Sequence, residues 1–386
     1  MSYTDWIESV LKYITNSKKL NILEFGCGLG TEFLLNNFNN VISYEISESN
    51  NWINTMIEKY KNYNNWTPYF HLSSDFNLND NDNIILETRG KERGNIDNVL
   101  NMINKVNKDV NINNINVVFV DAGIYNRGEI AQYYINYGVD IIIIHDYIEP
   151  VLYGYDKLIF NNYGNILYDI GCKTMIFKKK VHKFQIFGER CSGTNYLENL
   201  LIYNFDCYNV NKYNKHFFKN DDYENDNDIL FIGIVRDIKK WINSFYRIPH
   251  YLEYMQPIKK EQFLNDPIIS KFNDNVLDYN IFTNEIYKNI FELRHIKLHY
   301  MVREMPKKMT NYILIRYEDL INDFENTLNR FKLYLNVKQN INYPINITQY
   351  KKEPYIYIPN NDIYITDEEI IKNKEYNNYF ENILLY

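Results

Sequence analysis

A loop rich in small residues, GERCSGTN, runs from Gly188 to Asn195 between an apolar segment and a segment with helical spacing. In a phosphate-binding loop of this kind, successive backbone N–H groups and the start of a helix hold an anion. The lysine that would reach a bound triphosphate is absent, because Thr194 follows Gly193 directly. The loop therefore keeps the backbone N–H groups that bind an anion, but it lacks the side chains that bind a magnesium-bound triphosphate. A phosphosulfate fits this loop, since its sulfuryl group carries less negative charge than a phosphoryl group.

A second stretch, FIGIVRDIKKWINSFYR, places Arg236 at the end of an apolar run and Ser244 in the helix that follows. An arginine can pair with a phosphate through two hydrogen bonds, and the serine can donate another. Loop and stretch together resemble the P-loop sulfotransferases that use 3′-phosphoadenylyl sulfate, over roughly residues 183–386, and ILIRYEDL resembles a late strand of that family. The resemblance implies that this cofactor contacts Gly188, Ser192, Gly193, Thr194, Asn195, Arg236 and Ser244.

The chain departs from the sulfotransferase pattern in two places. Many members carry a basic residue where this chain has Cys191, although a bacterial-type branch with G-E-R-N-S-G-T-N-Y-L is closer. The C-terminal phosphate motif of the family has no clear counterpart, and Lys351 and Lys352 are a poor substitute.

Sulfate transfer to a hydroxyl needs a base for the proton and positive charge near the leaving oxygen. Lys215 and His216 in YNKHFF lie between the two cofactor stretches, as a catalytic pair does in the bacterial-type branch. We expect His216 to act as the general base, because a neutral imidazole takes up protons near pH 7. Lys215 or Arg190 would stabilise the developing charge. His250 is the other candidate base, and an exposed strand-end pair is the alternative interpretation of Lys215 and His216.

The first half carries another glycine-rich turn, LEFGCGLGT, between a predicted strand and a predicted helix. Glycines there permit a tight turn and close approach of a ligand. Glu45 ends the next predicted strand and is placed to accept hydrogen bonds from ribose hydroxyls. The pattern resembles motif I of class I S-adenosylmethionine methyltransferases over roughly residues 20–180. The spacing of its glycines and the preceding Glu24 favour S-adenosylmethionine over a nicotinamide dinucleotide as the ligand. The alternative is that the turn binds no ligand and only closes the fold. The implied cofactor contacts are Glu24, Gly26, Gly28, Gly30 and Glu45.

Two later stretches, VVFVDAGIYNRGEIAQ and VDIIIIHDYIEP, end predicted strands in Asp121 and in His145 and Asp146. The carboxyl ends of parallel strands border the ligand crevice, so these side chains should lie at its rim. Both stretches resemble segments of xylan-type polysaccharide O-methyltransferases. A His or Asp there can accept the proton of an attacking hydroxyl, and Asp121 and Asp146 could hold a divalent metal. The alternative is that His145 and Asp146 only cap the strand.

Short apolar runs alternate with helical segments in both halves, which predicts parallel sheets with helices on both faces. The strand candidates of the first half are LNILEFG, NVISYEIS, NIILE, NVVFVDAG, VDIIIIHDY and KTMIFKKK. Those of the second half are KFQIFG, DILFIGIVRD and NYILIRYEDL. We expect an α/β protein with a Rossmann-like methyltransferase domain over 1–180 and a P-loop sulfotransferase-like domain over 181–386.

Composition limits the partners and the compartment. The 386 residues carry a formal net charge of -7 without a long basic run, which argues against nucleic-acid binding. Four cysteines without a C-x-x-C pair favour a reducing compartment. We therefore expect a cytoplasmic protein, in a host cytoplasm if the gene is viral. The N-terminus does not look like a secretory signal, and the apolar runs are too short to span a bilayer.

These patterns predict a bifunctional transferase that methylates one hydroxyl and sulfates another on a glycan or glycoside. Both local resemblances favour carbohydrate, and the aromatic residues suit stacking on sugars. Two alternatives stay open: a sulfotransferase with a degenerate methyltransferase-like domain that binds the acceptor, and a non-enzymatic scaffold built on two nucleotide-binding folds. The retained Arg236 and Ser244 argue against the scaffold.

Overall fold

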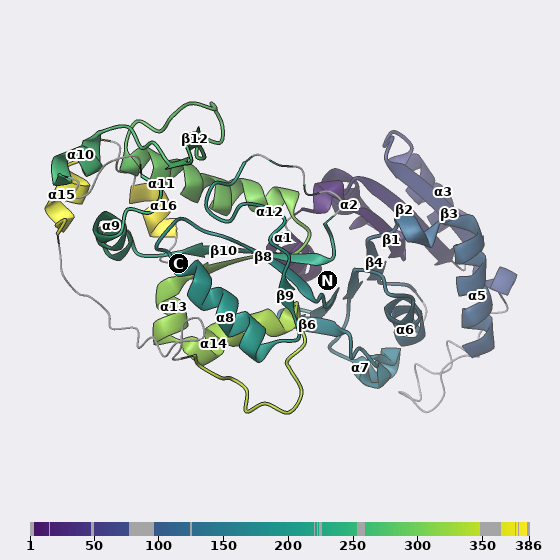
Figure 1. Cartoon of the computed structure of the whole chain (residues 1–386). Coiled ribbons are helices and arrows are strands. Elements are labelled where there is room, and N and C mark those ends of the chain that lie inside the picture. Colours follow the sequence, from purple (N-terminus) through teal and green to yellow (C-terminus); the bar gives the residue numbers. More distant parts are fainter. Residues whose placement is uncertain are drawn as a thin grey trace. The chain divides into compact units, whose positions relative to one another are not determined.

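The computed structural model describes residues 4–14, 16–47, 50–76, 96–123, 126–219, 221, 223, 226–252, 259–347, 364–374, 376 and 378–383. The predicted strand NIILE and the pair Lys351 and Lys352 lie outside these residues. The chain divides into two units, Met1–Lys180 and Val181–Tyr386 (Figure 1). Within the described ranges, no helix combines the length and the apolar composition that crossing a membrane requires.

The first unit is built on a seven-stranded sheet in the order β3-β2-β1-β4-β5-β7-β6. Strands β1 to β5 pair in parallel, and β7 runs antiparallel to both of its neighbours. The chain runs outwards from β1 to β3 and then returns to β4 on the other side of β1, so the switch point lies between β1 and β4. The predicted Rossmann-like α/β fold is thus confirmed for this unit. The strands are β1 Asn21–Phe25, β2 Asn40–Ser47, β3 Trp66–Leu72, β4 Val117–Val120, β5 Ile141–Ile144, β6 Tyr163–Tyr168 and β7 Thr174–Lys179.

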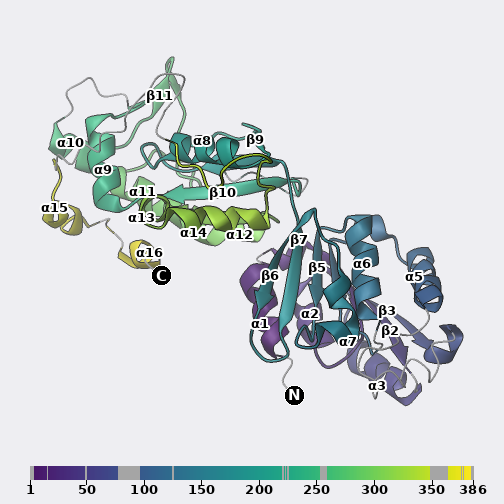
Figure 2. The ribbon, with the colours of Figure 1, turned by 90° about the horizontal axis from the view of Figure 1, so that it is seen from below.

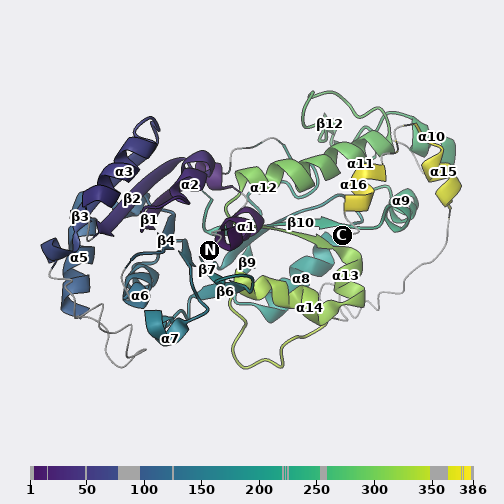
Figure 3. The same ribbon diagram turned by 180° about the vertical axis from the view of Figure 1, so that it is seen from behind.

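Helices cover both faces of this sheet, as the continuous apolar runs of its central strands require. Trp6, Leu34 and Met56 place α1, α2 and α3 in one core with alternate strand residues (Figure 3). Met102 and Tyr134 place α5 and α6 in the other core (Figure 2). The helices are α1 Thr4–Tyr13, α2 Thr31–Asn37, α3 Asn50–Tyr60, α5 Ile96–Asp109, α6 Arg127–Tyr137 and α7 Pro150–Tyr153.

Three strands of this sheet differ from the sequence-based prediction. WTPYFHL forms β3 and YGNILY forms β6, although neither was among the strand candidates. Both lie at the edges of the sheet, where strands lack the continuous apolar run of the centre. KTMIFKKK forms a strand as predicted, but it is antiparallel, because the short turn after β6 brings the chain straight back.

The second unit contains a four-stranded parallel sheet in the order β13-β10-β8-β9. Successive residues of β10 point to opposite faces. Leu230, Ile232 and Ile234 pack with α8, α13 and α14, whereas Phe231 and Val235 pack with α11 and α12 (Figure 1). The strands are β8 Lys183–Phe187, β9 Tyr208–Asn209, β10 Ile229–Val235 and β13 Tyr312–Arg316, with a small hairpin of β11 Lys271–Phe272 and β12 Asn275–Val276.

The segments TNYLENLLIYN, after the second loop, and WINSFYR, after Arg236, form α8 and most of α9. The segment NDFENTLNRFKLYL, which also has helical spacing, contains α14 and a short 3-10 segment. The end of the strand candidate NYILIRYEDL is not a strand but belongs to helix α13. The P-loop sulfotransferase assignment of this unit remains a prediction. The helices are α8 Thr194–Asn204, α9 Ile238–Arg247, α10 Lys260–Asn265, α11 Ile290–His299, α12 Met305–Lys308, α13 Tyr317–Asn322, α14 Phe324–Asn329, α15 Asp367–Ile371 and α16 Asn378–Ile383.

Candidate functional sites

The first glycine-rich turn joins the end of β1 to the start of α2. Gly26 has a φ of 100°, and a Cβ atom there would lie 2.2 Å from the carbonyl oxygen of Asp121. A Cβ atom at Gly30 would lie 2.4 Å from the ring of Trp6. Gly28 differs, because a Cβ atom there would meet no atom within 4 Å. Gly26 and Gly30 therefore serve packing, whereas Gly28 leaves room for a ligand beside the turn.

Glu24 supports this turn from inside the protein. Its buried carboxylate accepts hydrogen bonds from Thr31 Oγ1 at 2.9 Å and from Ser43 Oγ at 2.7 Å. Burial raises the pKa of Glu24 to about 8, and the two hydroxyl donors offset only part of that effect. The predicted contact of Glu24 with the cofactor is corrected by this geometry, because protein groups enclose the carboxylate. Glu24 instead fixes the first residue of α2 against the sheet.

Glu45 reaches the same turn from β2. Its Oε2 accepts a hydrogen bond from the backbone N–H of Cys27 at 2.5 Å. Burial raises the pKa of Glu45 to about 7, while the Cys27 N–H lowers it and Asp121 raises it further. On the other side of Cys27, Trp52 Nε1 donates to the carbonyl oxygen at 3.1 Å. Glu45 is therefore a carboxylate next to the switch point that changes its charge near neutral pH.

Asp121, His145 and Asp146 come together at the carboxyl ends of β4 and β5, as the sequence predicts for a ligand crevice. Arg127 Nη1 lies 3.0 Å from Asp121 Oδ1 and 2.9 Å from Asp146 Oδ2. His145 is buried, with Nδ1 3.4 Å from Asp121 Oδ1. Burial opposes protonation of His145, but the carboxylates of Asp121, Asp146 and Asp5 outweigh it and raise the pKa.

A divalent metal between Asp121 and Asp146 does not fit this arrangement. The buried guanidinium of Arg127 already bridges the two carboxylates. A metal ion at that place would lie against a cation that cannot lose its proton. The expected metal site between Asp121 and Asp146 is therefore corrected by this geometry, because Arg127 occupies its place.

The second loop joins β8 to α8 and has the form of an anion-binding turn. Gly193 has a φ of 95° and lies at the N-cap of α8. A Cβ atom on Gly193 would lie 2.4 Å from the ring of Tyr317, so the loop packs closely on the start of α13. The backbone N–H groups at Cys191, Gly193 and Thr194 donate to no acceptor within the described ranges. Such N–H groups at a helix start are the donors that an anion would use.

The other predicted loop residues divide between ligand-side and protein-side roles. Ser192 is buried, and its Oγ donates to the carbonyl oxygen of Glu189 at 2.5 Å, which points the hydroxyl into the protein. Asn195, in the first turn of α8, accepts a hydrogen bond from Lys215 Nζ at 2.6 Å. Gly188 N–H donates to the carbonyl oxygen of Lys215 at 2.9 Å. The segment that carries Lys215 is thus fastened to both ends of the loop.

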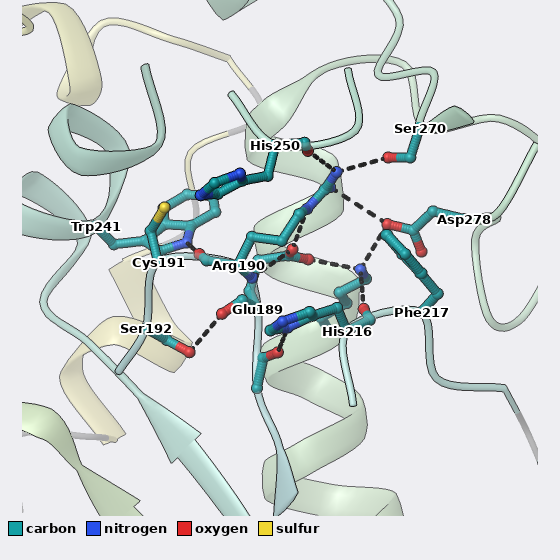
Figure 4. Close-up of polar contacts among 12 residues, drawn as sticks. Glu189, Arg190, Cys191, Ser192, His216, Phe217, Trp241, His250, Ser270 and Asp278 are labelled. Carbon is teal, nitrogen blue, oxygen red and sulfur yellow. Dashed lines mark hydrogen bonds and ion pairs between the residues drawn. The ribbon is translucent and has the colours of Figure 1, made fainter. Parts of the chain in front are cut away.

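Arg190 lies beneath the loop rather than on its surface (Figure 4). Its side chain is 1% exposed. The guanidinium donates to Glu189 Oε1 at 2.8 Å, to Ser270 Oγ at 2.9 Å and to the His250 carbonyl oxygen at 2.9 Å. Asp278 Oδ2 lies 3.5 Å from its third nitrogen. The predicted role of Arg190 in stabilising leaving-group charge is corrected by this geometry, because its donors face protein groups and not solvent.

Lys297, from α11, completes a buried cluster of four charges with Glu189, Arg190 and Asp278. Lys297 Nζ donates to Glu189 Oε2 at 2.5 Å, to Asp278 Oδ2 at 2.7 Å and to the His216 carbonyl oxygen at 2.8 Å. Burial alone would raise the pKa of Glu189, but Lys297 and Arg190 outweigh it and hold the pKa at about 2. The cluster is neutral overall and ties the loop to the His216 segment. Trp241 Nε1 anchors it further by donating to the Arg190 carbonyl oxygen at 2.9 Å.

His216 lies beside the loop, with Nδ1 2.7 Å from the Gly188 carbonyl oxygen (Figure 4). A carbonyl oxygen only accepts, so the neutral imidazole carries its proton on Nδ1 and has a lone pair on Nε2. Burial lowers the pKa of His216 to about 4, which leaves the ring neutral at pH 7. The side chain of His250 is more exposed, and burial and the nearby Arg190 lower its pKa. His216 is therefore neutral at pH 7, as a base must be, but its lowered pKa makes it a weaker base than the expected imidazole that takes up protons near pH 7.

Arg236 and Ser244 both meet the loop at Cys191. Arg236 Nη1 donates to the Cys191 carbonyl oxygen at 3.0 Å, and its guanidinium lies over the Tyr317 ring, 4.9 Å from the centroid. Burial raises the pKa of the Cys191 thiol, while a hydrogen bond with Ser244 lowers it. The structure thus brings the two predicted phosphate contacts to the loop.

A cavity of about 10 Å³ lies on the protein side of this loop. Its lining includes Glu189, Ser192, Arg294 and Lys297. It has room for about one water molecule. This cavity is therefore far too small for a nucleotide.

Arg127, Tyr317 and Lys297 are among the residues of these sites that the sequence analysis did not single out. Arg127 belongs to the stretch VVFVDAGIYNRGEIAQ, and Tyr317 directly follows ILIR in the strand candidate NYILIRYEDL. Both could therefore have been predicted from the sequence. Lys297 lies in ELRHIKLHY, which carries no motif. The only signal at Lys297 is that it and Arg294 are basic residues among the apolar residues of the buried side of α11.

No protein-family model matches the chain, and no curated protein sequence matches it. Solved structures do match. The SAH-bound methyltransferase PaMTH1 of Podospora anserina is 15% identical over 47% of this chain and 80% of its own, with a TM-score of 0.28. An rRNA methylase from Streptococcus thermophilus is 12% identical over 45% and 92%, with a TM-score of 0.26. A dimethyladenosine transferase from Plasmodium falciparum is 14% identical over 45% and 61%, with a TM-score of 0.27. Likenesses this weak do not support a function for this chain.

Proposed function

We propose that the chain is a transferase with two donor sites, one for S-adenosylmethionine and one for 3′-phosphoadenylyl sulfate. The observation that carries the proposal is that each glycine loop lies among side chains of the charge its donor requires. Glu45 accepts a hydrogen bond from the first loop, and the Asp121 carboxylate is close enough to raise the pKa of Glu45. Arg236 and Lys215 lie at the second. The first donor is a sulfonium cation at its reactive centre, and the second is an anion.

In the first unit, Gly28 leaves the opening and Glu45 would accept hydrogen bonds from the ribose hydroxyls. Bound S-adenosylmethionine would supply an electrophilic methyl group. Asp121, His145 and Asp146 lie at the same end of the sheet and would orient the acceptor hydroxyl and remove its proton.

In the second unit, the N–H groups at Cys191, Gly193 and Thr194 would hold the 5′-phosphosulfate, and Arg236 with Ser244 the 3′-phosphate. His216 Nε2 would take the proton of the acceptor hydroxyl. Lys215, which Asn195 keeps next to α8, would stabilise the negative charge that develops on the leaving group.

We propose a carbohydrate as the acceptor of both groups. Two exposed rings support this for the second unit: Tyr251 is 46% exposed and Phe272 is 56% exposed, with ring centroids 6.1 Å apart. Tyr251 also contacts Phe217, the residue next to His216. Aromatic rings of this kind suit the apolar face of a sugar.

Calorimetric titration of the full chain with S-adenosylmethionine and with 3′-phosphoadenosine 5′-phosphate tests the donor sites. We expect one equivalent of each to bind independently. Transfer of radiolabelled methyl and sulfate to a panel of glycans then tests the acceptor. Binding of neither nucleotide would overturn the proposal, and binding of the second nucleotide only would reduce it to a sulfotransferase.

A further inference from the structure

Three segments that are distant in sequence meet beside β5 in the first unit. The turn after β6 pairs with the segment after β5, since Tyr147 N–H donates to the Lys173 carbonyl oxygen at 3.0 Å and Ile148 N–H to that of Cys172 at 3.2 Å. Asp5, from α1, accepts a hydrogen bond from the Cys172 N–H at 3.1 Å. These bonds hold the Cys172 thiol next to His145 and Asp146.

The side chains brought together here are a set of metal-ligand types. One atom each of His145, Asp146 and Cys172 lies within 4.8 Å of the other two. His145 Nδ1 and Asp146 Oδ1 are 3.5 Å apart. Tetrahedral zinc with its usual bond lengths separates nitrogen, oxygen and sulfur ligands by about 3.3–3.8 Å. The nitrogen and oxygen atoms already have this spacing, and the thiol sulfur would need to approach them by at most about 1 Å.

The imidazole of His145 provides a second, independent observation. The residue is 8% exposed, and its ring nitrogens lie 3.4 Å from the carboxylates of Asp5 and Asp121, which is longer than a normal hydrogen bond. Buried imidazole nitrogens are normally bonded, so this ring is set up for a further partner. Asp5, Asp121 and Asp146 surround it, and Arg127 balances only part of their charge.

We infer that His145, Asp146 and Cys172 bind a divalent cation of borderline softness, with Zn²⁺ the best match to one nitrogen, one oxygen and one sulfur ligand. The thiol proton is released to solvent when the sulfur binds the cation. Arg127 pairs with Asp121 Oδ1 and with Asp146 Oδ2, which keeps Asp121 out of this ligand set and leaves Asp146 Oδ1 for the cation. This site differs from the pair of Asp121 and Asp146 that Arg127 bridges.

The role of this cation rests on the proposed methyl transfer, in which the cation would bind the acceptor hydroxyl. Three protein ligands leave a tetrahedral ion one position for water or for an acceptor hydroxyl. A hydroxyl bound to such an ion loses its proton more readily. His145 would then act as a ligand that helps to hold the acceptor, and the proton would leave from the ion-bound hydroxyl.

Titration of the chelator-treated full chain with Co²⁺ tests the site directly, because a cobalt–thiolate bond gives a charge-transfer band in the near ultraviolet. We expect one equivalent of Co²⁺ with this band, displacement of the cobalt by Zn²⁺, and release of protons during binding. Cys172→Ser should remove the band, and His145→Asn should remove stoichiometric binding. Cys207→Ser, at a half-buried cysteine of the second unit, should change neither.

Absence of stoichiometric binding in the folded parent chain would overturn the inference, as would a band that persists in Cys172→Ser. Titration of Cys172→Ser with S-adenosylmethionine separates this site from the donor site. If the chain binds cobalt through Cys172 but never binds S-adenosylmethionine, the metal site stands and the proposed methyl transfer fails. If it binds S-adenosylmethionine but no metal, the metal site fails and the donor site stands.

Discussion

The two glycine loops occupy equivalent places, each between the first strand of its unit's parallel sheet and the next helix, but their acidic residues are in opposite states. In the first unit, Glu24 and Glu45 are braced by hydroxyls and one backbone N–H, and burial raises their pKa values to about 8 and about 7. In the second unit, Glu189 lies between Lys297 and Arg190, which outweigh burial and hold its pKa at about 2. A buried carboxylate thus keeps or gives up its proton according to whether a cation stands beside it.

This difference shows that the backbone shape of a glycine loop does not by itself select a ligand. The first loop has carboxylates that a cationic donor would help to ionise. At the second loop the acid is neutralised inside the protein, and the cations Lys215 and Arg236 contact the loop at Asn195 and at the Cys191 carbonyl. The charge around each loop, and not its glycine spacing, separates the two proposed donors.

The largest expected effect comes from the ion cluster of the second unit. Lys297→Met leaves Glu189 and Asp278 buried with only Arg190 as counter-ion, which should lower the free energy of unfolding by about 3–5 kcal/mol. Lys183→Met is the matched control, since Lys183 pairs with Asp228 at the surface and its loss should change stability little. Urea unfolding measures both. Equal losses in the two variants would show that the cluster does not brace the loop.

The next effect separates the ligands. Arg236→Ala should weaken binding of 3′-phosphoadenosine 5′-phosphate by about 100-fold, because two charge-assisted hydrogen bonds are lost. Binding of S-adenosylmethionine should stay unchanged. Arg247→Ala, at the exposed end of α9, serves as the control for a lost surface charge. Calorimetric titration measures these affinities. If Arg236→Ala weakens the binding of both nucleotides, the two nucleotides do not bind at separate sites.

Two glycines of the first loop offer a contrast between packing and ligand space. Gly26→Ala should cost about 1–3 kcal/mol of stability, because it puts a Cβ atom against the Asp121 carbonyl at a positive φ. Gly28→Ala should leave thermal stability unchanged yet weaken S-adenosylmethionine binding. If Gly28→Ala binds the donor as well as the parent chain, the ligand does not lie beside Gly28.

The smallest expected effect is the pH dependence of the first site. The pKa of Glu45 is about 7 without ligand, and only the carboxylate can accept two ribose hydroxyls. Below that pH a proton must leave before binding, so affinity should fall by up to about tenfold per pH unit. Above it, affinity should level off. Glu45→Gln should bind more weakly and with a flat profile between pH 6 and pH 8. A variant that keeps the parent profile would assign the titration to another group.

The sequence was sufficient for the central strands but not for the edges of the first sheet. β4 and β5 are four-residue apolar runs that are buried on both faces, which is the pattern of a covered parallel sheet. β3 contains Pro68 and is only partly buried, so its composition does not distinguish it from a loop. The direction of β7 depends on the length of the turn before it, which an isolated apolar segment does not show.

For the sites, the loops and their anchoring residues could be predicted because each is a short continuous motif. The direction in which the neighbouring side chains point could not be predicted. Arg190 neighbours the loop in sequence, but its partner Asp278 comes 88 residues later and decides that the guanidinium turns inward. Glu24 likewise turns inward because Ser43, 19 residues along the chain, offers a hydroxyl from the adjacent strand. Such pairings are set by the packing of distant segments, and no local pattern reports them.

Three of the four tryptophans touch a glycine loop: Trp6 packs on Gly30, Trp52 binds the Cys27 carbonyl, and Trp241 binds the Arg190 carbonyl. Trp52 is 40% exposed and Trp241 is fully enclosed, so their emission maxima should differ. The chain therefore carries built-in optical reporters, two at the first loop and one at the second. A variant that keeps only one of these tryptophans would report changes at its own loop by ultraviolet fluorescence, with no dye attached.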